Sequence, residues 1–419
     1  MIEQQNVFDR VESQVRSYCR AFPAVFDKAR GAFLYDEAGN EYIDFFCGAG
    51  TLNYGHNNPG IKRAVIDYLQ KDGVIHSLDM WTVAKREFLE TFDSVILKSR
   101  ALSYKVQFTG PTGANAVEAA LKLARKVKRR SNVIAFTNAY HGLSAGALSI
   151  TGNRHFRNEA FVNRLDVAFM PYDGYLGQTV NTLDYLRRLL EDKSSGLDLP
   201  AAVILETIQA EGGINVARYE WLQELEQICR AFDILLIVDD IQVGNGRTGT
   251  FFSFEPAGIQ PDLVVLSKAI GGLGLPMSLL LLKPEVDEWK PAEHTGTFRG
   301  NNLAFVAATE ALAYWKGSRF QEDIIRKGGI LASRLVGLKE KYPQFVRQVR
   351  GRGLIYGLEM ATPQLAKAVS QQAFARKLIV ELAGAEDDVL KFLPPLIIEE
   401  PVLSKGLEII DESIAAAAR

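Results

Sequence analysis

The chain is poor in cysteine. Its 419 residues include only Cys19, Cys47 and Cys229, and none of these stands in a CxxC or Cys/His spacing. Disulfide-stabilised secreted domains and structural zinc sites both need closely spaced cysteines. The sequence therefore favours neither, and we expect the reducing cytoplasm as its compartment.

Long apolar segments and an excess of positive charge are lacking too. The sequence has no run of about 18 apolar residues that could span a bilayer, and its polar start, MIEQQNVFDRVES, has no basic region followed by an apolar one. The formal net charge is −2, whereas nucleic acids and anionic membranes attract strongly basic surfaces. We expect no membrane and no nucleic-acid partner, so the partners should be small molecules and other protein chains.

The composition is that of a large globular protein. Hydrophobic residues make up 47% of the chain and charged residues 23%, which is enough for a core divided over two domains. We predict a small α+β domain from residues 1–60 and 311–419, and a large domain from residues 61–310. Residues 7–20 and 59–71 have helical periodicity, and residues 31–46 alternate about a turn as in a β-hairpin.

The large domain alternates between strand-like and helical segments. The strand-like runs are KVQFT, NVIAFT, VAFMPY, AAVILET, ILLIVDD and LVVLSK. Most are apolar along their whole length, which is typical of parallel strands covered by helices on both faces. We therefore predict an α/β fold with a mostly parallel sheet, in which ligands bind at the carboxyl ends of the strands.

Two of these runs end in charged residues. Asp239 follows five apolar residues, and Lys268 follows the next run. A buried charge must find a partner or be neutralised. Asp239 can hold the protonated ring nitrogen of pyridoxal phosphate, and Lys268 can bind its aldehyde covalently. The alternatives are a solvated Lys268 and a metal at Asp239 and Asp240, although adjacent strand residues point to opposite faces.

Two other strand ends offer groups for a flat, phosphorylated ligand. Thr112, Gly113 and Ala114 form a turn into a helix, where small residues and free N–H groups favour an anion. An ordinary helix cap explains the same residues. Tyr140 follows another strand, and its ring can stack on a ligand or simply pack half-buried. The ordered set, rather than any single motif, indicates pyridoxal phosphate.

A fifth strand end carries two carboxylates. Glu206 and Glu211 flank a short segment that leads into Gly212 and Gly213. Paired carboxylates can serve in acid–base chemistry or bind a cation, and a solvated loop explains them equally well. We retain both residues as candidates for substrate binding.

The chain resembles the class III, or omega, aminotransferases of the pyridoxal-phosphate fold type I along nearly its whole length. More narrowly, it is similar to the diaminobutyrate–2-oxoglutarate aminotransferases of ectoine biosynthesis. The segments that carry this resemblance are AGTLNYGHNNP, QFTGPTGANAVEAALKLARK, SSGLDLPAAVI, ILLIVDDIQVGNGRTGTFFSFE and HTGTFRGNNLAF.

The resemblance implies a role for each residue around the ring of the cofactor. Lys268 would hold pyridoxal phosphate covalently and later move a proton between substrate and cofactor. Asp239 would pair with the ring nitrogen, and Gln242 would bond the ring hydroxyl. Tyr140 would stack on one face of the ring and Ile241 on the other.

The phosphate would be held by two subunits. The resemblance places it on the backbone of Thr112, Gly113 and Ala114, with Thr297 of a second subunit completing the site, so the protein would be at least a homodimer. Many family members have glutamate where this chain has Asn115. That difference concerns the side chain and leaves backbone binding of the phosphate unaffected.

The expected substrate site departs from the family pattern. The family often binds the α-carboxylate of glutamate with an arginine that pairs at other times with the residue corresponding to Glu211. This chain has Lys391 at that place, and lysine cannot form the two-pronged contact that arginine makes with a carboxylate. We predict a Glu211–Lys391 pair, with a solvated Lys391 as the alternative. Arg299 is another cation available for a carboxylate.

The resemblance implies amino transfer from L-glutamate to L-aspartate 4-semialdehyde, giving L-2,4-diaminobutyrate and 2-oxoglutarate. One alternative is another omega-aminotransferase, acting on ornithine, acetylornithine or 4-aminobutyrate. Others are an aminomutase or decarboxylase of the same fold and a non-catalytic protein with an interaction role. The presence of Lys268, Asp239 and Gln242 argues against the last of these.

Overall fold

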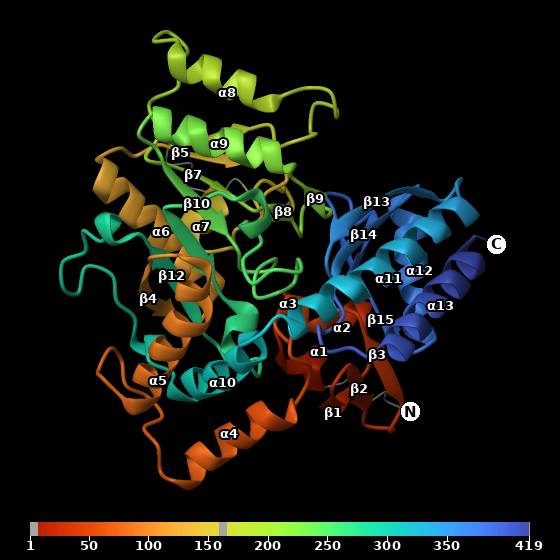
Figure 1. Ribbon diagram of the computed structural model, residues 1–419. Helices are drawn as coiled ribbons and strands as arrows, with labels where there is room; N and C mark the ends of the chain where they lie inside the picture. The colour runs from red at the N-terminus through yellow and green to blue at the C-terminus, as the bar shows by residue number, and fades with distance from the viewer. Residues whose placement is uncertain (1–6, 159–165, 419) are drawn as a thin grey trace.

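The computed structural model describes residues 7–158 and 166–418, and its largest sheet has seven strands (Figure 1). The spatial order is β4-β12-β11-β10-β7-β5-β6. In that order, the strands span Lys105–Gly110, Ser278–Leu282, Leu263–Leu266, Leu235–Asp239, Ala202–Leu205, Val133–Phe136 and Val167–Met170. All neighbours are parallel except those of β12, which is antiparallel to β4 and β11. The predicted mostly parallel sheet is confirmed.

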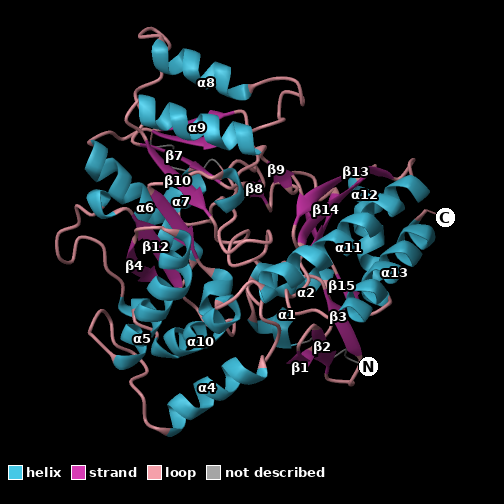
Figure 2. Cartoon of the chain, viewed as in Figure 1, coloured by secondary structure: helices cyan, strands magenta, loops and turns pink. Residues whose placement is uncertain are grey.

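Helices cover both faces of this sheet. Successive residues of a strand point to opposite faces, so neighbouring residues belong to different cores. Ile134 and Val264 belong to a core shared with α8, α9 and α10, whereas Val133 and Val265 belong to a second core shared with α6. The four helices span Thr182–Glu191, Tyr219–Ala231, Asn302–Leu312 and Gly113–Lys128. Figure 2 shows these helices around the central strands. This arrangement explains why the strands are apolar on both faces.

Two smaller sheets lie outside the large one, and the N-terminal and C-terminal segments of the chain meet in one of them. One contains β1, β2, β3 and β15, spanning Phe26–Arg30, Phe33–Asp36, Glu41–Asp44 and Leu378–Ile379. The other contains β13, β14, β17 and β16, spanning Val346–Arg352, Ile355–Met360, Val389–Phe392 and Glu381–Ala383. Strand β3 pairs in parallel with β15, which joins the N-terminal and C-terminal segments. This pairing supports the proposed small domain built from both ends.

The remaining elements connect or cover these sheets. Helices α11, α12 and α13 span Arg319–Lys341, Pro363–Ala375 and Glu400–Ala417 beside the smaller sheets (Figure 1). Helices α3, α4, α5 and α7 span Cys47–Gly50, Pro59–Gln70, Val83–Thr91 and Ala145–Ser149, and the short strands β8 and β9 span Ile208–Gln209 and Asn215–Val216. None of the helices that the structure describes is both long and apolar enough to cross a bilayer.

Most local predictions are confirmed, with two differences. The hairpin of β2 and β3 and the helix α4 lie where the sequence indicated. The predicted helix over residues 7–20 is instead two short helices, α1 (Val7–Val11) and α2 (Tyr18–Ala21). Neither buries a residue, so no packing face supports a continuous helix. Strand β12 was not predicted from the sequence.

Candidate active site

Asp239 and Lys268 extend from neighbouring parallel strands. Asp239 ends β10, where it lies opposite Val265 of β11, and Lys268 follows the end of β11 by two residues. Asp239 is 4% exposed. Lys268 has a left-handed backbone, with φ of 53°, a conformation that is costly for a residue with a side chain and is concentrated at functional sites. The two strand ends therefore present both groups at one edge of the sheet.

The ammonium of Lys268 is disfavoured by its surroundings. Burial lowers the pKa of Lys268, while the carboxylate of Glu211 opposes this shift and Lys391 adds to it. In the part of the chain that the structure describes, its side chain makes no hydrogen bond. The neutral amine is the form that attacks an aldehyde, and a lowered pKa increases its share.

His141 holds Asp239, a contact that the sequence did not reveal. Its Nδ1 lies 2.7 Å from Oδ2 of Asp239, and the backbone N–H of Ile241 donates to Oδ1 at 3.1 Å. Burial opposes protonation of His141, but the hydrogen bond and charge of Asp239 outweigh it and raise the pKa of the imidazole. In the sequence, the only indication of this role of His141 is its position next to Tyr140, after the end of a strand.

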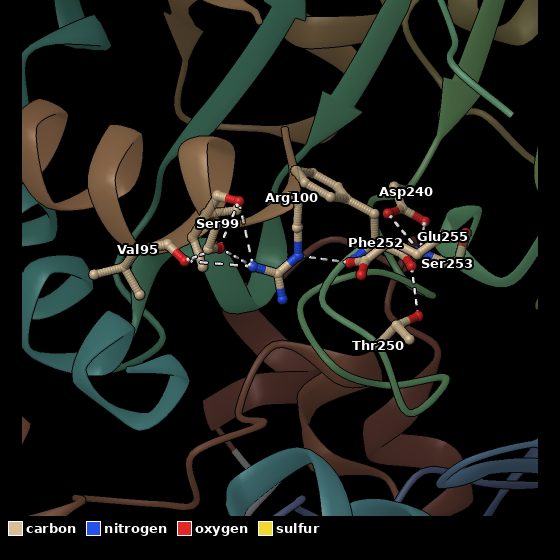
Figure 3. Close-up of polar contacts among 9 residues, drawn as sticks. Val95, Ser99, Arg100, Asp240, Thr250, Phe252, Ser253 and Glu255 are labelled. Carbon is tan, nitrogen blue, oxygen red and sulfur yellow. Dashed lines mark hydrogen bonds and ion pairs between the residues drawn. The ribbon is translucent and has the colours of Figure 1, made fainter. Parts of the chain in front are cut away.

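Asp240 points away from Asp239. Its carboxylate accepts the backbone N–H of Ser253 at 3.0 Å, and burial raises the pKa of Asp240 to about 7. Figure 3 shows this contact beside the ion pair between Arg100 and Glu255, 2.9 Å long, which anchors the same loop. The two adjacent carboxylates thus have different partners, as expected for neighbouring residues of a strand.

The turn before α6 lies against the segment that follows Asp239. A Cβ atom on Gly113 would come within 2.7 Å of Ile241, so only glycine allows this approach. The backbone N–H and the hydroxyl of Thr112 both donate to Oδ1 of Asn115, at 3.2 and 2.9 Å. Asn115 thus orients the turn, and the N–H groups at the start of α6, from Gly113 and Ala114, are available for an anion.

Glu206 holds the loop that carries Tyr140. Its two oxygens accept the backbone N–H groups of Tyr140 at 3.0 Å and of Ala210 at 3.2 Å. Burial raises the pKa of Glu206 to about 7, although the charge of His141 opposes the shift. The ring of Tyr140 meets Phe156 edge-on, with ring centres 5.4 Å apart. We infer that Glu206 positions Tyr140 rather than the substrate.

Glu211 and Lys391 form an ion pair, as the sequence predicted. Nζ of Lys391 lies 2.7 Å from Oε1 of Glu211 and 2.9 Å from Oε2 of Glu381. The side chain of Lys391 has no exposed area, so the solvated alternative is wrong. Gln242 joins the cluster, because its Nε2 donates to Glu211 at 3.0 Å and to the carbonyl of Ala49 at 3.1 Å. Glu381 was not recognised from the sequence.

Thr297 lies apart from this group. Its carbonyl accepts a hydrogen bond of 2.6 Å from Nε2 of His76, and the described residues include no hydrogen bond between Thr297 and the turn at Gly113. Arg299, two residues later, forms an ion pair with Asp79. A role of Thr297 at the phosphate of a second subunit therefore remains a proposal.

Comparison with solved structures supports the same fold. The chain superposes on the ornithine aminotransferase of Toxoplasma gondii with a TM-score of 0.85 and 27% identity, covering 98% of this chain and 94% of that one. It superposes on the acetylornithine aminotransferase of Elizabethkingia anophelis with a TM-score of 0.80 and 25% identity, covering 98% and 97%. The ornithine aminotransferase holds pyridoxal phosphate at partial occupancy in its active site. Fold and site together define an enzyme of the fold type I transferase class.

The family follows from the sequence comparisons. The model of the family described as Aminotransferase class-III matches residues 15–414, and this chain belongs to that family. A curated relative from Wolinella succinogenes, named diaminobutyrate–2-oxoglutarate transaminase, is 63% identical over 99% of this chain and 96% of its own length. A relative of the same name from Halalkalibacterium halodurans is 56% identical, covering 98% and 96%.

Proposed function

We propose that this enzyme transfers an amino group from L-glutamate to L-aspartate 4-semialdehyde, giving L-2,4-diaminobutyrate and 2-oxoglutarate. The observation that carries this proposal is the 63% identity, over 99% of the chain, to a diaminobutyrate–2-oxoglutarate transaminase. The solved ornithine and acetylornithine aminotransferases are only 27% and 25% identical. We place the reaction in the cytoplasm, within ectoine biosynthesis.

The residues of the site fit pyridoxal phosphate as cofactor. The partly buried amine of Lys268 matches its aldehyde, and the buried carboxylate of Asp239 matches its ring nitrogen. The cradle at Gly113, which a Cβ atom would fill, matches its phosphate. When bound, the cofactor supplies an electron sink for the carbon that gains or loses the amino group.

The protein contributes orientation and proton transfer. Asp239 would keep the ring nitrogen protonated, and His141 would hold Asp239 in place through its 2.7 Å contact. Tyr140 and Ile241 would hold the ring between them, and Nζ of Lys268 would move the proton at the substrate carbon.

Gln242 and Lys391 would act on either side of Glu211. Gln242 donates to Glu211 and lies 3.4 Å from Lys391 through its amide oxygen, so its predicted bond to the ring hydroxyl would connect the cofactor with this ion pair. Lys391 would bind the carboxylate of glutamate when Glu211 releases it. The exposed fraction of the Glu211 side chain is 25%, whereas that of Lys391 is zero, so Glu211 is the partner that is free to move.

We further propose a homodimer or a higher homo-oligomer. Large apolar side chains are exposed near Thr297, with Trp81 exposed at 97%, Phe298 at 67% and Met80 at 60%. A cavity of about 1000 Å³ opens beside Trp81 and Arg299. Large apolar side chains exposed in this way fit a protein interface, and a second copy that covers them would bring Thr297 towards a partner.

The direct test is a steady-state assay with purified enzyme, L-glutamate and L-aspartate 4-semialdehyde, following 2,4-diaminobutyrate. We expect robust turnover, and weak or no turnover when ornithine, acetylornithine or 4-aminobutyrate is offered with 2-oxoglutarate. Inactivity with aspartate semialdehyde together with activity on one of those amines would refute the proposed substrate. Turnover of a single amine without any aldehyde or keto-acid acceptor would indicate an aminomutase or a decarboxylase instead.

The variant Lys268→Ala tests the chemistry independently of the substrate. Without the amine, covalent attachment of the cofactor and proton transfer at the substrate carbon are both lost. We expect the variant to lack the visible absorbance of the attached cofactor and to show no turnover. A Lys268→Ala variant that retains either property would contradict the assigned role.

A further inference from the structure

Glu381 places a second carboxylate on Lys391. It lies on β16, directly opposite Lys391 of the antiparallel strand β17, and its exposed fraction is 6%. Nζ of Lys391 thus lies between Oε2 of Glu381 at 2.9 Å and Oε1 of Glu211 at 2.7 Å. With both carboxylates ionised, the three side chains carry a net charge of −1.

The cluster of Glu211, Lys391 and Glu381 contains two carboxylates and only one ammonium. Burial alone would raise the pKa of Glu211. The positive charges of Lys391 and Lys268 outweigh burial and lower this pKa to about 2. For Glu381, burial together with the charge of Glu211 prevails over Lys391, and the pKa of Glu381 is raised. Lys391 therefore compensates Glu211 and leaves Glu381 poorly compensated, as expected when two carboxylates share one ammonium.

The geometry around Glu381 agrees with this imbalance. Oε2 lies 2.9 Å from Nζ of Lys391, but no residue that the structure describes gives it a hydrogen bond of good direction. Tyr18 is 49% exposed, and burial of its hydroxyl, followed by the charges of Glu381 and Glu211, raises its pKa. Lys268 is the other cation that acts on Glu381. The carboxylate is therefore within electrostatic range of both the half-exposed Tyr18 and the reacting lysine.

We propose that Glu381 determines specificity by binding the α-ammonium group of the diamino substrate, an assignment that rests on the proposed function. An ammonium beside a buried carboxylate forms a strong, charge-assisted contact. 4-Aminobutyrate has the same carbon chain as 2,4-diaminobutyrate but no α-ammonium group, so it offers only a carboxylate to a cluster that is already negative. Glu381 thus favours diamino acids over simple omega-amino acids.

The test compares these two amines in the holoenzyme, with 2-oxoglutarate as acceptor. We expect Glu381→Gln to lower kcat/KM for 2,4-diaminobutyrate by roughly 10- to 100-fold, since the acceptor keeps its shape but loses the charge that pairs with the ammonium. The value for 4-aminobutyrate should stay the same or rise, because its carboxylate then meets one negative charge fewer, so the ratio of the two falls. Glu381→Asp retains the charge and should recover part of the loss. Glu386→Gln, on an exposed residue of the same hairpin, is the matched control and should change neither value.

The outcomes separate this assignment from the proposed function. An equal loss with both amines would show that Glu381 only supports Lys391, and no loss with either would show that it does not contact substrate; both overturn the proposal. A wild-type enzyme that converts 4-aminobutyrate but not 2,4-diaminobutyrate would overturn the proposed function, and this assignment with it. If the wild-type enzyme is active on 2,4-diaminobutyrate but Glu381→Gln does not change the ratio of the two kcat/KM values, only the role assigned to Glu381 is overturned.

Discussion

Removing the cation of the Glu211–Lys391–Glu381 cluster should cost more stability than removing one of its carboxylates. Lys391→Met retains most of the side-chain volume but leaves the half-buried Glu211 and the buried Glu381, 2.7 and 2.9 Å from the former ammonium, without their common partner. Glu211→Gln leaves a one-to-one pair between Lys391 and Glu381. The two variants therefore differ in the sign of the charge change, while each alters a single side chain.

The expected magnitudes follow from burial. Leaving a buried charge without its partner costs about 3–5 kcal/mol. An unfolding entropy of about 2.1 cal/mol/K per residue, over 419 residues, converts this cost into a fall in Tm of roughly 3–6 °C. For Glu211→Gln we expect a fall of about 1 °C or less, because the lost attraction to Lys391 is offset by better compensation of Glu381.

The pH dependence gives a second check on the same variant. The pKa of Glu211 is lowered from 4.5 to about 2 in the folded wild type, so its stabilising contribution is present above pH 4.5 and is lost as the pH falls through about 2. In Lys391→Met both carboxylates lose the charge that favours ionisation and take up protons already at mildly acidic pH. The Tm difference between variant and wild type should therefore shrink as the pH is lowered from about 7.5 to about 5.

The assay is thermal unfolding of the purified holoenzyme by calorimetry, with the double variant Lys391→Met, Glu211→Gln as a further control. Removing one of the two carboxylates that have lost their partner should restore part of the fall in Tm. If Glu211→Gln destabilises the protein as much as Lys391→Met, or if the double variant is no more stable than Lys391→Met, the cluster does not have the charge balance inferred from the structure.

Three further predictions concern other parts of the protein. His141→Phe removes the hydrogen bond to the buried Asp239 and should weaken binding of pyridoxal phosphate by about 10- to 100-fold, measured by titrating cofactor-free enzyme; unchanged affinity would contradict the positioning role. Burial raises the pKa of Asp240 to about 7 from 3.8, so its ionisation reduces stability as the pH rises through that range. Asp240→Asn should accordingly raise Tm more at about pH 8.5 than at about pH 5, and equal gains at both would refute this reasoning. Trp81→Glu should convert the proposed oligomer into monomers in analytical ultracentrifugation, and an unchanged sedimentation coefficient would exclude this surface as the interface.

The sequence by itself predicted the parts of the protein that depend on local patterns. Apolar runs alternating with helical segments predicted the mostly parallel sheet, because strand and helix periodicities are properties of short segments. The same patterns located Asp239 and Lys268 at strand ends. Parallel strands present their carboxyl ends at one edge, so their proximity followed without coordinates. The family resemblance then added Lys391 as the partner of Glu211, which the structure places at 2.7 Å.

The tertiary structure alone decided which distant residues complete the site. The contact of His141 with Asp239 spans 98 residues of sequence, and Glu381 meets Lys391 only because the register of β16 and β17 places them opposite each other. Likewise, the backbone N–H groups of Tyr140 and Ala210 donate hydrogen bonds to the two oxygens of Glu206. The sequence alone indicated Glu206 as a candidate for substrate binding. A pattern along the chain reports the face and end of each element. Strand register, and the approach of loops far apart in sequence, depend on how those elements pack together.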